Sequence, residues 1–91
     1  MGAVAETLRA KLTAAFSPIS LQIDDDSARH AGHAGARASG ESHFNVVIQA
    51  AAFEGVARVQ RQRLVYAALA DELAGPVHAL SVKALAPGEA G

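Results

Sequence analysis

Hydrophobic and polar residues alternate along this chain with two different periods. In residues 3–16 the apolar side chains recur at every fourth position, which predicts an amphipathic helix with one buried face. The positions concerned are Val4, Leu8, Leu12 and Phe16. Ser17-Pro18 follows directly. Because proline disfavours the helical conformation in the residue before it, we expect the helix to end there.

Three later segments have a period of two, which is typical of strands with one face in a core. They are residues 19–24, 43–50 and 80–85. In the second segment, for example, Phe44, Val46 and Ile48 fall on the same side. The pattern therefore predicts three half-buried strands.

A second helical pattern covers residues 58–73. The stripe expected to face the core recurs at spacings of three and four and consists of Val59, Gln62, Tyr66, Leu69 and Leu73. Gly75 favours a left-handed helix stop, and Pro76 cannot continue the helix. We expect the helix to end at this pair, just before the last strand.

The predicted order is helix, strand, strand, helix, strand, within a single domain of residues 1–91. This order fits an α+β fold, a two-layer αββαβ sandwich in which two helices cover one face of a three-stranded mixed sheet. The first two strands would pair antiparallel, and the third would join after the second helix crosses the sheet. We expect an ordered core over about residues 3–86, a long loop over residues 27–42 and a frayed tail over residues 87–91.

Charge and composition narrow the possible functions. The 91 residues include 8 Lys or Arg and 9 Asp or Glu, so the formal net charge of −1 does not favour nucleic acid or an anionic membrane. Cysteine is absent, which excludes disulfides, a cysteine nucleophile and a metal site built from this chain's own thiolates. No apolar run approaches the roughly 18 residues of a membrane helix. We expect a cytoplasmic protein with no membrane partner.

The histidines are the side chains best suited to bind a metal. His30 and His33 lie in the long loop, His43 opens the second strand and His78 follows the helix stop. Two of them also fit an ordinary structural role: His43 as a strand-end side chain bonded to backbone, and His78 as a helix-exit residue satisfied by a carbonyl. No GxSxG nucleophile motif occurs. We therefore do not expect an enzyme.

Three arginines, Arg58, Arg61 and Arg63, open the second helix. Basic residues at this positive end of the helix dipole are disfavoured by roughly 0.3–1 kcal/mol each. They are either solvated side chains or a surface that faces something acidic, and the sequence leaves both interpretations open.

Several motifs occur in an order and spacing that resemble the BolA family. They are GESHFNVVI at residues 40–48, Phe53-Glu54-Gly55, RVQRQRLVYAALADEL at residues 58–73 and VHAL at residues 77–80. The resemblance runs from about Leu8 to Leu85. It implies an αββαβ fold related to the type II KH fold, with an extra helical turn before the last strand. The chain departs from the family at Gln62, where histidine is usual, and we expect Gln62 to pack or hydrogen-bond inward.

The resemblance also implies a non-enzymatic partner that forms a heterodimer with a monothiol glutaredoxin. The two proteins would share a bridging 2Fe–2S cluster in iron–sulfur cluster assembly, trafficking or iron sensing. Glutaredoxin would supply a cysteine and a bound glutathione thiolate. This chain would supply His78 and a loop residue that matches His30, with His33 as the rival position. No cofactor is expected in the isolated chain, and no small-molecule substrate.

The alternative is a nucleic-acid-binding transcriptional regulator that uses the KH-like fold. Arg58, Arg61 and Arg63, aided by Lys83, would then contact DNA phosphates. In the glutaredoxin interpretation the same arginines would form a docking surface for an acidic protein partner. The near-neutral overall charge favours the protein partner.

Overall fold

The computed structural model describes residues 3–25 and 43–89. The helices and strands are α1 (Ala3–Phe16), β1 (Ser20–Asp25), β2 (His43–Gln49), α2 (Arg58–Ala68), α3 (Ala70–Ala74) and β3 (Ala79–Leu85), with a 3-10 turn η2 (Ala51–Phe53) after β2. The first helix and the three strands agree with the predicted limits to within one residue.

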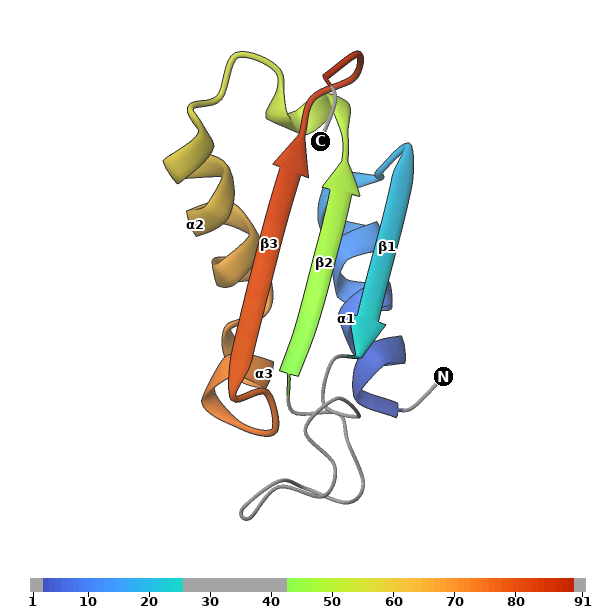
Figure 1. The fold of residues 1–91 in the computed structure, drawn as a ribbon, viewed down its shortest axis with the longest axis vertical. Helices are drawn as coiled ribbons and strands as arrows, with labels where there is room; N and C mark the ends of the chain where they lie inside the picture. The colour runs from blue at the N-terminus through green and yellow to red at the C-terminus, as the bar shows by residue number, and fades with distance from the viewer. Residues whose placement is uncertain (1–2, 26–42, 90–91) are drawn as a thin grey trace.

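The three strands form a mixed sheet in the order β1-β2-β3. β1 is antiparallel to β2, with Ser20 opposite Gln49, and β2 is parallel to β3, with His43 beside Ala79. β2 and β3 therefore begin at the same end of the sheet, where α3 also lies (Figure 1). The predicted α+β fold with a three-stranded mixed sheet is confirmed.

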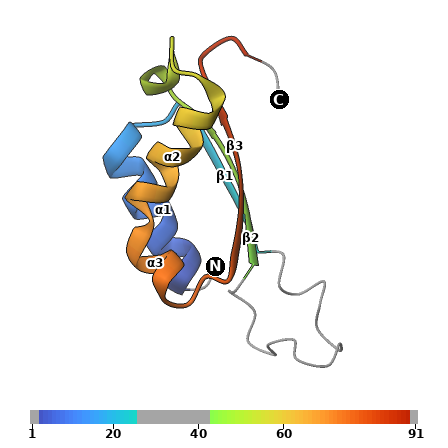
Figure 2. The same cartoon turned by 90° about the vertical axis from the view of Figure 1, so that its left-hand side faces the viewer.

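The helices α1 and α2 cover the same face of the sheet, so the molecule has two layers (Figure 2). The alternation in β2 accounts for this arrangement, because Phe44, Val46 and Ile48 are buried while the residues between them are only partly buried. Leu8 and Leu12 of α1 are fully buried, as the four-residue period predicts. The core therefore lies between the sheet and the helices.

The second helix, predicted as one element over residues 58–73, divides at Leu69, whose backbone leaves the helical region (φ −110°, ψ 21°). α3 then continues to Ala74 and ends before Gly75. The predicted left-handed conformation of Gly75 is wrong, because its φ is −115°. A Cβ at this position would lie 3.3 Å from the Asp71 carbonyl. Glycine is favoured here by that close approach of backbone, not by a positive φ.

The buried face of α2 also differs from the predicted stripe. Val59 is 65% exposed and Tyr66 is 36% exposed, although the spacing predicts both in the core. The buried side chains of α2 are Arg61 and Val65, and Leu69 follows four residues later. The buried stripe differs from the predicted one because Arg61 turns inward. An apolar pattern places a charged residue on the outside of the helix, but here the charge of Arg61 is compensated inside the protein.

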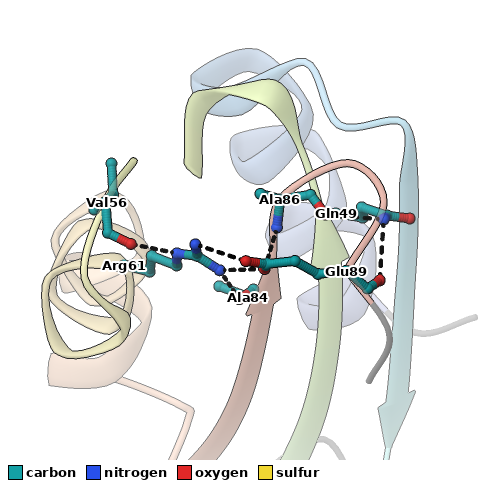
Figure 3. Close-up of polar contacts among 6 residues, drawn as sticks. All are labelled: Gln49, Val56, Arg61, Ala84, Ala86 and Glu89. Atoms are coloured by element: carbon teal, nitrogen blue, oxygen red, sulfur yellow. Dashed lines mark hydrogen bonds and ion pairs between the residues drawn. The ribbon is translucent and has the colours of Figure 1, made fainter. Parts of the chain in front are cut away.

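Arg61 is only 5% exposed, and its guanidinium lies among polar groups at the end of β3 (Figure 3). It donates from Nε to the Val56 carbonyl at 2.7 Å and from Nη1 and Nη2 to the Glu89 carboxylate at 2.6 and 3.2 Å. The carboxylate also accepts a hydrogen bond from the Ala86 N–H at 2.8 Å. The hydrogen bonds from Arg61 and then Ala86 lower the pKa of Glu89 to about 2. The carboxylate therefore stays ionised at neutral pH.

These contacts correct the prediction that the chain frays from residue 87. Gly88 has a positive φ of 86°, and the Glu89 N–H donates to the Ala86 carbonyl at 3.1 Å. Gln49, at the end of β2, donates from Nε2 to the same carbonyl at 3.0 Å. The chain therefore turns back over the end of the sheet and is held there as far as Glu89 (Figure 3).

The strand β3 lies at an edge of the sheet, yet its outward carbonyls accept hydrogen bonds from α2. The Leu85 carbonyl accepts from the Ala50 N–H at 3.0 Å, on the β2 side, so alternate carbonyls point away from β2. The donors to these are Tyr66 Oη to Leu80 at 3.1 Å, Gln62 Nε2 to Val82 at 2.6 Å and Arg61 Nη1 to Ala84 at 3.1 Å. The predicted hydrogen-bonding role of Gln62 is confirmed. Occupied carbonyls also make this edge a poor template for another strand.

Candidate functional site

His78, the ligand that the resemblance implies, is exposed in the short turn between α3 and β3. The residues on both sides of it are held in place. Val77 is 3% exposed, and its N–H donates to the Glu72 carbonyl at 3.0 Å. Ala79 begins β3. The turn therefore presents the imidazole at the surface from an ordered backbone.

Glu72 ties this turn to the first helix. Lys11 of α1 donates to Glu72 Oε1 at 3.0 Å and lies 2.8 Å from Oε2. The hydrogen bond to Glu72 raises the pKa of Lys11. The Glu72 carbonyl accepts hydrogen bonds from the N–H groups of Gly75 and Val77. One residue thus links α1 to the segment that carries His78.

His43, the first residue of β2, lies beside His78. Their imidazole centroids are 6.4 Å apart, and the ring planes are inclined by 17°. The parallel register explains this, because His43 pairs with Ala79, the residue after His78. A hollow of about 180 Å³ opens beside His43, lined by His43, Phe44, Asn45, Ala79, Leu80 and Ser81. His43 was not among the predicted ligands, because its proximity to His78 depends on a strand pairing that no local motif shows.

The predicted loop ligands, His30 and His33, lie outside the described residues, so their role stays a prediction. They precede His43 by 13 and 10 positions. β1 ends, and β2 begins, at the end of the sheet where β3 also begins. Asp25 and His43, the described residues on either side of this segment, therefore lie at the same end of the sheet as His78.

Imidazole donors of this kind fit one iron of a 2Fe–2S cluster that a second protein completes. Two histidines replace two cysteines on one iron in Rieske centres. Within residues 3–25 and 43–89, no three His, Cys, Asp or Glu side chains come together as a metal site. Since the chain has no cysteine, thiolate ligands would have to come from a partner.

The four predicted basic contacts do not form one surface. Arg58 and Arg63 are exposed on α2. Arg61 is buried, which corrects the prediction that it faces a partner, since its charge is compensated inside the protein. Lys83 is exposed between two buried residues of β3, so it points to the sheet face opposite the helices. Of this set, only Arg58 and Arg63 are exposed on α2.

A family model described as BolA-like protein matches residues 12–89. The chain belongs to the BolA family. The BolA domain of SufE1 from Arabidopsis thaliana superposes with a TM-score of 0.86 at 41% identity, covering 99% of each chain. The α+β fold with its mixed sheet is thus that of solved BolA structures.

Curated relatives support the same assignment. BolA-like protein 1 from Mus musculus is 46% identical over 88 residues, which cover 97% of this chain and 61% of the relative. The DNA-binding transcriptional regulator BolA of Escherichia coli is 42% identical over 79 residues, which cover 87% of this chain and 71% of the relative. The chain spans less than two thirds of the length of the mammalian relatives. No helix in the described part of the chain is long and apolar enough to cross a membrane.

Proposed function

We propose that this chain is a non-enzymatic, cytoplasmic partner of a monothiol glutaredoxin and co-ligates a 2Fe–2S cluster that bridges the two proteins. The observation that carries the proposal is His78, an exposed imidazole on an ordered turn of a BolA-family chain without cysteine. Its position matches the histidine ligand of the family. The heterodimer would act in iron–sulfur cluster assembly, trafficking or iron sensing.

Histidine ligation would set the properties of the shared cluster. Glutaredoxin would supply a cysteine and a bound glutathione thiolate, and this chain would supply two imidazoles. Neutral imidazoles in place of thiolates leave a cluster less negative and raise its reduction potential. Protonated imidazole cannot bind iron, so the chain should release its share of the ligands in mild acid. We assign the second imidazole to His30, with His33 as the rival.

The exposed face of α2 is the docking surface in this proposal. Arg58 and Arg63 would face an acidic patch on the glutaredoxin, and the exposed side chains of Val59 and Leu64 on the same helix add apolar contact area. Charges at the rim of an interface raise the association rate more than the affinity. The arginines would therefore raise the rate at which the partner associates.

Anaerobic mixing of the chain with a monothiol glutaredoxin, glutathione, iron and sulfide tests the proposal. Visible absorbance and circular dichroism report the ligands of the cluster. His78→Ala should abolish the histidine-ligated spectrum without lowering thermal stability, because the side chain is exposed. Gln60→Ala, at another exposed position, is the matched control. A spectrum unchanged by His78→Ala would refute the proposal.

The same mixture distinguishes the two loop histidines. His30→Ala should weaken or shift the spectrum, and His33→Ala should leave it unchanged. The opposite result would move the second ligand to His33 and leave the role of His78 intact.

Nucleic-acid binding is the second candidate function, because the relative from Escherichia coli is named as a DNA-binding transcriptional regulator. Arg58 and Arg63 are exposed on α2 and could contact phosphates, whereas Arg61 is buried and could not. Each phosphate contact contributes about −0.9 to the slope of log K against log salt. Replacing both arginines by alanine should therefore reduce the magnitude of the slope by roughly 2. Absence of salt-dependent duplex binding by the wild-type chain would exclude this function.

A further inference from the structure

Two histidines lie side by side where the parallel strands β2 and β3 begin. The imidazole centroids of His43 and His78 are 6.4 Å apart, with ring planes inclined by 17°. His43 is half-buried at the end of the sheet, whereas His78 is exposed. The pair thus combines one imidazole anchored by the sheet with one that a dissolved ion can reach.

We propose that His43 and His78 form a binding site for a divalent transition-metal ion on this chain alone. The inference goes beyond the proposed function, because it needs neither glutaredoxin nor a shared cluster. Imidazole nitrogen is a preferred ligand of Zn²⁺, Cu²⁺ and Ni²⁺. The described residues bring no third His, Cys, Asp or Glu side chain to the pair. Water or another small ligand would therefore occupy the remaining coordination positions, as in open metal sites.

The separation of the two rings is compatible with chelation of one ion. At a metal–nitrogen distance of about 2.0–2.1 Å, two nitrogens on a tetrahedral ion lie roughly 3.3 Å apart. The register already places the two backbones on adjacent strands, with His43 beside Ala79. Chelation then requires that the exposed His78 side chain rotate to bring the ring nitrogens together. The hollow of about 180 Å³ beside His43 has room for the waters that complete the coordination.

Occupation of this site would compete with cluster ligation, because His78 is required for both. A chain loaded with Zn²⁺ should therefore assemble less histidine-ligated cluster with glutaredoxin than the metal-free chain. Free divalent ions would in this way lower the fraction of chains in which His78 is available to bind the cluster.

Titration of the full chain with Zn²⁺ and Cu²⁺, without glutaredoxin, tests the inference. We expect one Zn²⁺ per chain by calorimetry, and an electron paramagnetic resonance spectrum of bound Cu²⁺ with couplings to two imidazole nitrogens. His43→Ala and His78→Ala should each weaken Zn²⁺ binding by at least about tenfold. In each variant the electron paramagnetic resonance spectrum of bound Cu²⁺ should show coupling to a single imidazole nitrogen. His43→Asn, which keeps a polar group at the half-buried position, provides a second variant, and far-ultraviolet circular dichroism verifies its fold.

The double variant of His30→Ala with His33→Ala is the control for the loop histidines. It should bind Zn²⁺ as tightly as the wild type. Loss of binding in this control, with binding retained in His43→Ala, would place the metal on the loop and overturn the inference. So would a wild-type chain that binds no Zn²⁺. Failure of the wild type to assemble a cluster with glutaredoxin would instead refute the proposed function and leave the metal titration valid.

Discussion

Gln62 provides a direct test of how α2 holds the edge strand. Its Nε2 donates to the Val82 carbonyl at 2.6 Å, at the position where the family usually has histidine. Gln62→Met removes this donor and keeps a side chain of similar length and helix propensity. The variant therefore isolates the hydrogen bond from changes in packing and in helix formation.

The expected loss is about 1 kcal/mol of the free energy of unfolding. A hydrogen bond between neutral groups contributes roughly 0.5–1.5 kcal/mol, and an acceptor left unsatisfied in a buried place costs about 1–3 kcal/mol. Gln62 is only partly buried. Water can therefore replace part of the lost hydrogen bond to the Val82 carbonyl. The expected loss of stability thus lies near the lower end of these two ranges. In a domain of this size, about 1 kcal/mol lowers the Tm by roughly 4–8 °C.

Thermal and urea denaturation followed by circular dichroism would measure this loss. Gln60→Met is the matched control, because Gln60 is exposed on the same helix and its replacement should change stability by no more than about 0.5 kcal/mol. Gln62→His should retain part of the stability, since an imidazole N–H can donate to the same carbonyl. Equal stability of Gln62→Met and the wild type would refute the reasoning. An equal loss in Gln60→Met would refute it as well.

Two further predictions concern charged groups. Glu89→Gln should lower the Tm at neutral pH, because the buried Arg61 loses its carboxylate partner. Folding lowers the pKa of Glu89 from 4.5 to about 2, so the difference in Tm between wild type and variant should be constant above pH 4.5 and shrink as the pH falls toward 2. Arg58→Glu combined with Arg63→Glu should slow association with glutaredoxin in stopped-flow measurements at low salt, and an unaltered rate would exclude these arginines from the docking surface.

The strands and the first helix could be predicted because one face of each lies in the core and the other lies toward the solvent. Phe44, Val46 and Ile48 alternate with less buried residues, and Leu8 and Leu12 repeat with the helical period. In such segments the local pattern and the final burial coincide. The order of elements, and with it the α+β fold, follows from these patterns together with the breaks between them.

Arg61 shows why the second helix could not be oriented correctly from its periodicity. A buried arginine requires a counter-charge and hydrogen-bond acceptors around it. Here the carboxylate belongs to Glu89, 28 positions later, in a segment whose composition indicates a frayed tail. The sequence around Arg61 and the sequence around Glu89 do not indicate that the two residues form an ion pair. The inward turn of Arg61 moves Val59 and Tyr66 toward the solvent, and the same contact orders the end of the chain.

The candidate site likewise includes one residue that a local motif indicates and one that depends on long-range strand pairing. His78 could be identified because it lies in a short motif directly before a predicted strand. Its neighbour His43 could not, because the two meet only through the parallel pairing of β2 with β3. That pairing holds one side of β3, and donors from α2 hold the other, Gln62 among them. Gln62 therefore belongs to the scaffold that positions the strand after His78, and not to the ligand set. A departure from the family at position 62 is therefore compatible with the metal ligation proposed for His78.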